Sequence, residues 1–156
     1  MIFFLTSIGL LMSSILGGVF FAFSSFIMPA LVRIPASASV RAMQQINLTV
    51  FHWSFMGLFY TMPLLCLGFI GNALMTPAGA ETPYLPAAAC IYLVGTFVIT
   101  GFGNVPLNEK LASLDPESDR AEAVWHHYSD RWTKLNHIRT AACLITTGLF
   151  IAALLE

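Results

Sequence analysis

Uncharged runs along the chain divide it into apolar segments. Four runs contain no Asp, Glu, Lys or Arg: Met1 to Val32, Ala42 to Ala80, Thr82 to Asn108 and Thr140 to Leu155. About 20 apolar residues cross a hydrocarbon core of about 30 Å, so these runs reach or nearly reach the length of membrane spans. The pattern predicts helices over residues 2–28, 46–75, 84–106 and 135–155. The expected fold class is therefore all-α: an integral membrane four-helix bundle in a single domain, 1–156.

The connection before the fourth helix is predicted to hold an amphipathic helix over residues 116–133. Asp115-Pro116-Glu117 is typical of a helix start, with a capping Asp, Pro at the first helical position and acid in the first turn. Trp125, Tyr128 and Trp132 then fall on one face. Two interpretations are open for this aromatic face: an interfacial belt that anchors the fourth helix, or a lid over a substrate site.

Composition places this bundle in lipid rather than in water. The 156 residues include 7 Lys or Arg and 8 Asp or Glu, so 10% are charged. Soluble domains have about 25% charged residues. The hydrophobic share of 57% and the mean hydropathy of +0.77 agree, and a lipid bilayer is the expected surrounding. The net charge of −1 provides no basic face, which excludes nucleic acid as a partner.

The distribution of basic residues predicts how the bundle is oriented. All seven lie in or beside the first and third connections: Arg33, Arg41, Lys110, Arg120, Arg131, Lys134 and Arg139. The second connection, from Thr76 to Pro83, carries none. By the positive-inside rule, connections one and three face the cytoplasm. We therefore expect a multi-pass protein of the cell inner membrane with both termini outside the cytoplasm.

Small residues are assigned to packing between helices. Ser14, Gly18 and Ala22 recur at four-residue steps and predict a close-packed seam on the first helix. Three cysteines stand singly in apolar surroundings with no CxxC pair, and they are interpreted as core residues: Cys66, Cys90 and Cys143.

Polar side chains form stripes on the third and fourth predicted helices. The third carries Thr96, Thr100, Asn104 and Asn108, and the fourth carries Asn136, Thr140, Cys143 and Thr147. Amides and hydroxyls turned to lipid would lose hydrogen bonds worth several kcal/mol each, so the two stripes are expected to face each other. Counting residues from the opposite helix ends places Ser24, Ser25 and His52 at about the same depth.

The segment Asn136-His137-Ile138-Arg139-Thr140 is the strongest candidate for a polar site. The uncharged run after Arg139 has 16 residues, about 24 Å of helix, so Arg139 either snorkels or is buried against partners. Because asparagines of the third helix are expected at its level, we favour a functional polar cluster over a structural one. No set of His, Cys, Asp or Glu has metal-ligand spacing, so no metal ligand is predicted, and the cofactor remains open.

Three blocks of sequence together resemble the anthrone oxygenase-like membrane family. They are Gly18 to Ser25 with Pro29-Ala30-Leu31, then Asn104-Val105-Pro106-Leu107-Asn108, and then Trp132 to Thr140. The resemblance implies a four-helix membrane protein, some of whose relatives oxidise anthrones to anthraquinones. It suggests a membrane oxidoreductase, a monooxygenase that oxidises a lipophilic aromatic or phenolic substrate with dioxygen.

For that reaction, the sequence suggests a role for each candidate residue. His137 is expected to act as the base, Asn104, Asn108 and Asn136 to donate hydrogen bonds to a developing enolate oxygen, and Arg139 to support its charge. The expected substrate-binding residues are Trp125, Tyr128, Trp132, Thr100, Thr140, Ser25 and His52.

Two non-catalytic functions remain as alternatives for the same polar cluster. A small-molecule binder or transporter would use the stripes to line a solute cavity, although four helices without an intramembrane carboxylate argue against coupled transport. Assembly into a homo-oligomer would answer the objection that one chain has only four helices. A membrane scaffold would use the amides to lock helices together, and it predicts a dry, fully paired cluster with no adjoining cavity.

Overall fold

The computed structural model describes residues 1–76 and 82–156, and within these ranges it contains helices and no strand. The helical elements are α1 (Ile2–Ala22), η1 (Phe23–Ile27), α2 (Met28–Leu31), α3 (Ala36–Thr49), α4 (Trp53–Met75), α5 (Tyr84–Tyr92), η2 (Leu93–Val98), η3 (Thr100–Asn104), α6 (Val105–Ala112) and α7 (Ala121–Leu155). Those marked η are wider π-helical turns. Four continuous stretches of the described chain are long and apolar enough to cross a membrane: Ile2–Leu31, Trp53–Met75, Tyr84–Ala112 and Ala121–Leu155. The all-α four-helix prediction is confirmed, and the chain is a multi-pass membrane protein.

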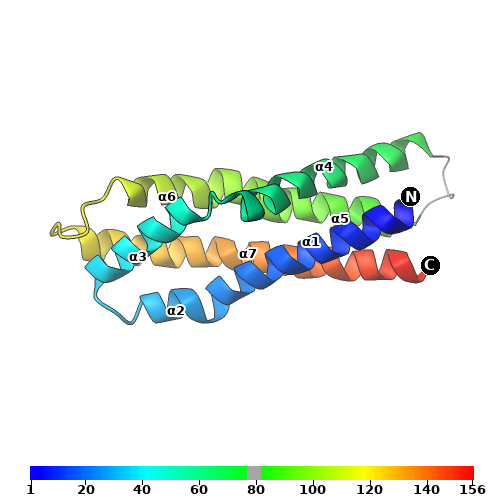
Figure 1. Ribbon diagram of the computed structural model, residues 1–156. Helices are drawn as coiled ribbons and strands as arrows, with labels where there is room; N and C mark the ends of the chain where they lie inside the picture. The colour runs from blue at the N-terminus through cyan, green and yellow to red at the C-terminus, as the bar shows by residue number, and fades with distance from the viewer. Residues whose placement is uncertain (77–81) are drawn as a thin grey trace.

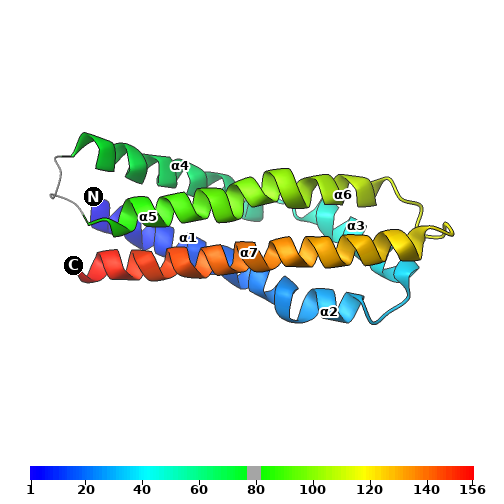
Figure 2. The ribbon, with the colours of Figure 1, turned by 180° about the vertical axis from the view of Figure 1, so that it is seen from behind.

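The spans lie roughly side by side, with both termini at one end of the bundle (Figure 1). From the opposite side, α7 runs the whole length beside α5 and α6 (Figure 2). The α2–α3 and α6–α7 connections lie at the end away from the termini, where the sequence places its basic connections. The prediction that this end faces the cytoplasm remains a prediction. Most of the predicted second connection, residues 77–81, falls outside the described residues.

The second predicted helix, 46–75, is divided in the structure. Residues 46–49 belong to α3, a separate 14-residue helix, and α4 begins only at Trp53. The His52 side chain caps α4, its ring nitrogen accepting a hydrogen bond from the Ser54 backbone at 3.5 Å. Because α3 carries Arg41 and several amides among its apolar residues, it is amphipathic rather than a continuation of the span.

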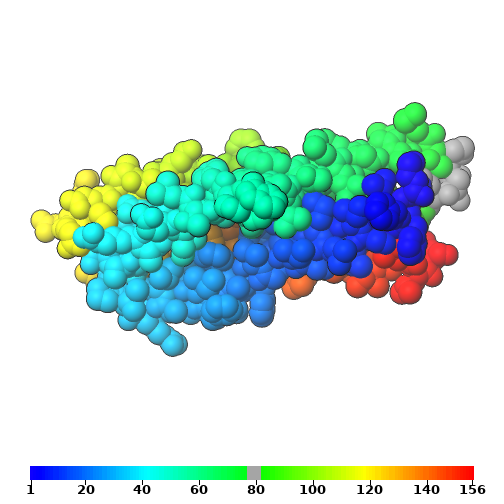
Figure 3. Space-filling model, viewed as in Figure 1, coloured from blue at the N-terminus to red at the C-terminus, as the bar shows by residue number. Residues whose placement is uncertain are grey.

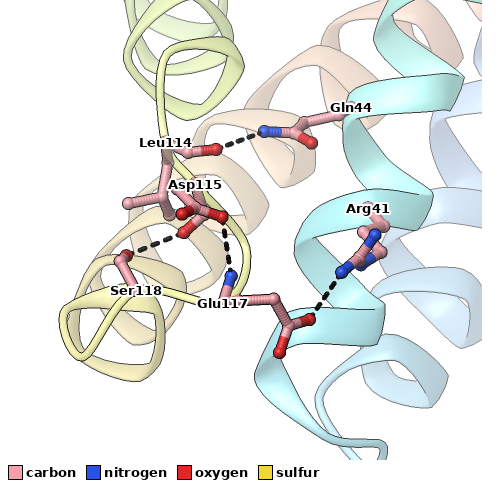
Figure 4. Close-up of polar contacts among 6 residues, drawn as sticks. All are labelled: Arg41, Gln44, Leu114, Asp115, Glu117 and Ser118. Carbon is pink, nitrogen blue, oxygen red and sulfur yellow. Dashed lines mark hydrogen bonds and ion pairs between the residues drawn. The ribbon is translucent and has the colours of Figure 1, made fainter.

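The two helices predicted for the C-terminal part, 116–133 and 135–155, are one helix. The 35-residue α7 begins at Ala121, and no Gly or Pro interrupts it before Gly148. The predicted start at Asp115 is instead a turn, in which the Asp115 carboxylate accepts a hydrogen bond from the Glu117 backbone at 3.0 Å (Figure 4). Without a helix breaker near position 134, the amphipathic connection and the span continue into each other.

Side chains of α3 hold the α6–α7 connection against the bundle. Gln44 donates to the Leu111 and Leu114 carbonyls, both at 2.9 Å, and so satisfies two groups at the end of α6. Arg41 pairs with Glu117 at 2.6 Å on the surface (Figure 4). These contacts place α3 over the first half of α7, which matters for the site described below.

Two of the π-helical turns precede prolines. The turn η1 ends two residues before Pro29, and η3 ends two residues before Pro106. Proline lacks a backbone donor and its ring collides with the carbonyl four residues earlier, so a wider turn relieves the collision. These irregular turns carry Ser24, Thr100 and Asn104, side chains that the polar site uses.

The small-residue seam on the first helix is displaced by one residue from the prediction. Ser14 and Gly18 are exposed, whereas Gly9, Ser13 and Gly17 are buried. A Cβ on Gly17 would lie 3.1 Å from that of Cys143, and the Ser13 hydroxyl lies 2.9 Å from that of Thr147. Both sets repeat every four residues, so spacing alone could not decide which stripe faces α7.

Replacing Gly95 with Ala is expected to lower the free energy of unfolding by about 1 to 3 kcal/mol, because extra atoms in a packed core force the backbone apart. A Cβ on Gly95 would lie 2.6 Å from the Ala142 Cβ. Gly101→Ala is the matched control, since nothing lies within 4 Å of its Cβ. Unfolding in mixed SDS micelles measures both variants, and equal stability of the two would contradict the close approach of η2 to α7.

Candidate active site

The centre of the polar site is the guanidinium of Arg139 on α7, whose residue is only 5% exposed. It donates to the Asn136 amide oxygen at 2.6 Å, and more weakly to the Thr100 hydroxyl at 3.4 Å. Its central carbon lies 4.4 Å from the Phe20 ring centroid and 5.0 Å from that of Trp132. Arg139 is therefore held by two aromatic faces, an amide and a hydroxyl, and does not snorkel.

Asn136 connects this guanidinium to the first helix. Its amide nitrogen donates to the Phe20 carbonyl and to the Ser24 hydroxyl, both at 2.7 Å. Thr140, one turn further along α7, donates to the Asn136 carbonyl at 2.9 Å and lies 3.3 Å from the Ser24 hydroxyl. One amide thus bonds α1 and η1 to α7 and fixes the direction of Arg139.

The asparagines of the third span position Trp132. Asn104 donates to the Trp132 carbonyl at 3.2 Å. The Asn108 oxygen accepts from the Trp132 indole nitrogen and from the Tyr128 hydroxyl, each at 2.9 Å. Asn108 is thus engaged in holding two aromatic rings, whereas the Asn104 oxygen is buried without a hydrogen-bond partner.

Arg139 has no counter-ion among the described residues. The ion pairs that the structure contains there are Arg41–Glu117 and Lys134–Asp130, both on the surface. A buried cation without a paired anion costs several kcal/mol, and polar groups inside membrane spans commonly mark functional sites. The Arg139 Nε atom also lacks a hydrogen-bond partner. The site therefore holds an unneutralised positive charge.

A mostly apolar pocket of about 130 Å³ adjoins this charge. Thr100, Asn104, Asn108, Trp132 and Arg139 supply its polar side, and apolar residues of α1, α3 and α4 supply most of the rest. Exposed side chains form its rim: Phe51, Tyr60 and Val105. In the space-filling view, a small orange area of α7 is visible between the blue α1 and the cyan α3 (Figure 3).

Several predicted site residues meet at this pocket. Thr100, Asn104, Asn108, Trp132 and Arg139 line it. Asn136 and Tyr128 bond to lining residues from behind, and Thr140 bonds to Asn136. The expectation that the two polar stripes face each other therefore matches the arrangement of the helices.

The structure does not bring His137, Ser25, His52 or Trp125 to the pocket. His137 is exposed and lines a groove between α2 and α7. Successive residues of a helix point about 100° apart, so His137 cannot share a face with Asn136 and Arg139. Ser25 is exposed and bonded to its own helix, and His52 is the exposed cap of α4. The predicted role of His137 as a base has no geometric support.

The interpretation of the aromatic face as a belt at the membrane surface is wrong. Trp125, Tyr128 and Trp132 are buried, and they pack in one cluster with Val40 and Met43 of α3. The prediction missed that α3 exists and covers them. Of the three aromatic residues, Trp132 lines the pocket.

Two contributors to the site were not selected from the sequence, and a third, Ser24, was placed at its depth but given no role. Phe20 supplies a ring face and a carbonyl, Ser24 supplies a hydroxyl, and Asn47 of α3 supplies an amide to the pocket lining. The signal for the first two was the stripe of Gly9, Ser13 and Gly17, which Phe20 and Ser24 continue. Within the described residues no three His, Cys, Asp or Glu side chains gather as a metal site.

The fold and the site define a multi-pass helical membrane protein with a buried cation beside an apolar pocket. The family model for anthrone oxygenase matches residues 49–149, so the chain belongs to the anthrone oxygenase family. The matched range includes Thr100, Asn104 and Arg139, and it confirms the resemblance noted from the sequence. Neither a curated protein nor a solved structure matches the chain.

Proposed function

We propose that the protein is a membrane oxidoreductase that oxidises a lipophilic aromatic ketone or phenol of the anthrone type with dioxygen. The observation that carries the proposal is the unneutralised Arg139 beside the apolar pocket. Membership of the anthrone oxygenase family supports the same class of reaction. An apolar pocket with a few convergent polar groups is the usual form of a site for such a ligand.

The chemistry of an anthrone suits a buried cation. Loss of a proton from its benzylic carbon gives an enolate whose charge rests largely on oxygen. In the net reaction this carbon loses two hydrogens and gains a carbonyl oxygen, while the second oxygen atom of O₂ leaves as water. Arg139 stabilises the enolate oxygen with its positive charge, and Asn104, which also lines the pocket, provides an amide beside the substrate.

The proposal assigns no base to the protein. The described residues that line the pocket include no His, Asp or Glu. A nearby positive charge favours the ionised form of an acid, so Arg139 would lower the pKa of the substrate itself. The proton would then pass to water rather than to an imidazole.

The size of the pocket indicates how a tricyclic substrate would be bound. A cavity of about 150 Å³ is known to hold one benzene molecule. The pocket of about 130 Å³ thus accommodates roughly one ring. The remaining rings would extend past the exposed side chains at its rim, Phe51, Tyr60 and Val105.

The arrangement does not favour the scaffold alternative. A scaffold predicts a dry and fully paired cluster, but Arg139 and Asn104 line a cavity, and the Arg139 Nε and Asn104 Oδ1 atoms are unpaired. Such atoms are more readily explained by a ligand that binds them.

Anthrone-dependent oxygen uptake by the purified protein, with the anthraquinone followed by its absorbance, tests the proposed function. Val50→Trp is expected to lower kcat/KM at least tenfold, because Val50 lines the pocket and an indole there would occupy the space of a substrate ring. Leu48→Trp is the matched control, since Leu48 is exposed on the same turn and does not line the pocket. Absence of uptake by the unmodified protein, or equal activity of both variants, would contradict the proposed site.

A further inference from the structure

A second groove lies between α2 and the first half of α7, and its lining shares no residue with the pocket beside Arg139. Its volume is about 540 Å³. Met28, Pro29, Val32 and Arg33 line it from α2 and the residues that follow it, and residues from His126 to His137 line it from α7. The oxidation proposed above does not use it.

Basic groups predominate in this groove. Arg33 is exposed and forms no ion pair within the described part of the chain, and His126 and His137 add two imidazoles. The one carboxylate in the lining, Asp130, is paired with Lys134 at 2.8 Å. Thr133 adds a hydroxyl to the lining, whereas the Ser129 hydroxyl donates to the His126 carbonyl at 3.2 Å. The groove therefore presents a positive charge and several hydrogen-bond donors, a combination that suits a phosphate.

The position of the groove along the spans corresponds to the headgroup layer. Counting about 20 residues of helix back from Leu155 reaches the edge of the hydrocarbon near Asn136. His137 is thus at that edge, while Lys134 and Asp130 lie one and two turns outside it. Eleven residues separate His126 from His137, about 16 Å of helix, so the groove extends from the acyl boundary through the headgroups. The apolar side chains of Met28, Pro29 and Val32 lie opposite.

We infer that this groove binds the headgroup of an anionic phospholipid. Its phosphate contacts Arg33 and Lys134, and the glycerol and first acyl carbons pack on Met28, Pro29 and Val32. Basic pockets between spans are known sites for anionic lipid headgroups, because the cations attract the phosphate where the apolar walls accept the chains. The inference does not depend on the proposed oxidation.

Binding of lipid to the full chain in detergent micelles, measured by native mass spectrometry, tests the inference. The probes are phosphatidylglycerol, phosphatidylcholine and inorganic phosphate. The unmodified protein is expected to bind phosphatidylglycerol at least tenfold more tightly than phosphatidylcholine. Arg33→Gln with Lys134→Gln is expected to remove that preference. Arg131→Gln with Arg120→Gln loses the same charge from residues outside the groove and is expected to retain the preference.

Three results would overturn the inference. The first is an unmodified protein that binds both lipids equally. The second is a groove variant that keeps its preference for phosphatidylglycerol, or whose preference falls no further than that of the charge-matched control. The third is inorganic phosphate that displaces phosphatidylglycerol at equal concentration, which would assign the groove to a soluble anion. Thermal unfolding of each variant without lipid is measured as well. If the variants and the unmodified protein have equal midpoints, a lost preference comes from the groove and not from a loss of stability.

Discussion

Replacing Arg139 with Met is expected to lower anthrone-dependent oxygen uptake by about 100-fold or more, the usual effect of removing a group that stabilises an oxyanion. The same change is expected to leave the thermal unfolding midpoint unchanged or higher. Arg139 is a buried cation without a paired anion, and replacing such charges by apolar side chains of similar length is often neutral or stabilising. The loss of its bond to Asn136, with a cost of about 1 to 3 kcal/mol, acts in the opposite direction.

The opposed effects on activity and stability distinguish a catalytic Arg139 from a structural one. Arg131→Met is the matched control, because Arg131 lies on the same helix, exposed and outside the pocket, and it should change neither quantity. Arg139→Lys keeps the charge but loses the planar donor fork, so activity between those of the Met variant and the unmodified protein is expected. An active but unstable Arg139→Met protein would identify the residue as part of a scaffold.

The four spans could be predicted from the sequence because charge is expensive in lipid. Runs without charge marked all four spans, and the cost of a lipid-facing amide predicted that the polar stripes of the third and fourth spans would meet. The same reasoning led to Asn104, Asn136 and Arg139, since few polar residues can lie at that depth without partners.

The direction of individual side chains could not be derived in this way. His137 was assigned to the cluster because it adjoins Asn136 in sequence, but one step along a helix turns a side chain by about 100°. The prediction of the small-residue seam on the first helix failed for a related reason, since two parallel stripes of small residues on that helix had the same spacing. Which stripe is buried depends on the partner helix, in this case on Cys143 and Thr147.

The apolar half of the pocket was missed because α3 was missed. Its sequence has neither the charge of a soluble helix nor the hydropathy of a span, and its stability comes from tertiary contacts such as Gln44 with the end of α6. Once α3 covers α7, the aromatic face of Trp125, Tyr128 and Trp132 has a protein partner and no longer needs the headgroup layer. A pocket formed by three or more elements is thus harder to predict than the polar stripe at its base.

Replacing Asn136 with Leu is expected to lower the free energy of unfolding by about 2 to 4 kcal/mol, because it leaves buried groups unsatisfied on two helices. The Phe20 carbonyl and the Ser24 hydroxyl lose their donor, and Arg139 loses its closest acceptor. Unfolding in mixed SDS micelles measures the change.

His127→Leu is the control for this variant, since it also exchanges a polar side chain for Leu on α7, but at an exposed position. Its stability should stay within about 0.5 kcal/mol of the unmodified protein, as for most surface substitutions. Single amide contacts between spans average only about 0.6 kcal/mol, so a loss of that size at Asn136 would mean that Arg139 finds another acceptor. The larger loss would mean that one amide holds both the α1–α7 contact and the charge on which the proposed reaction depends.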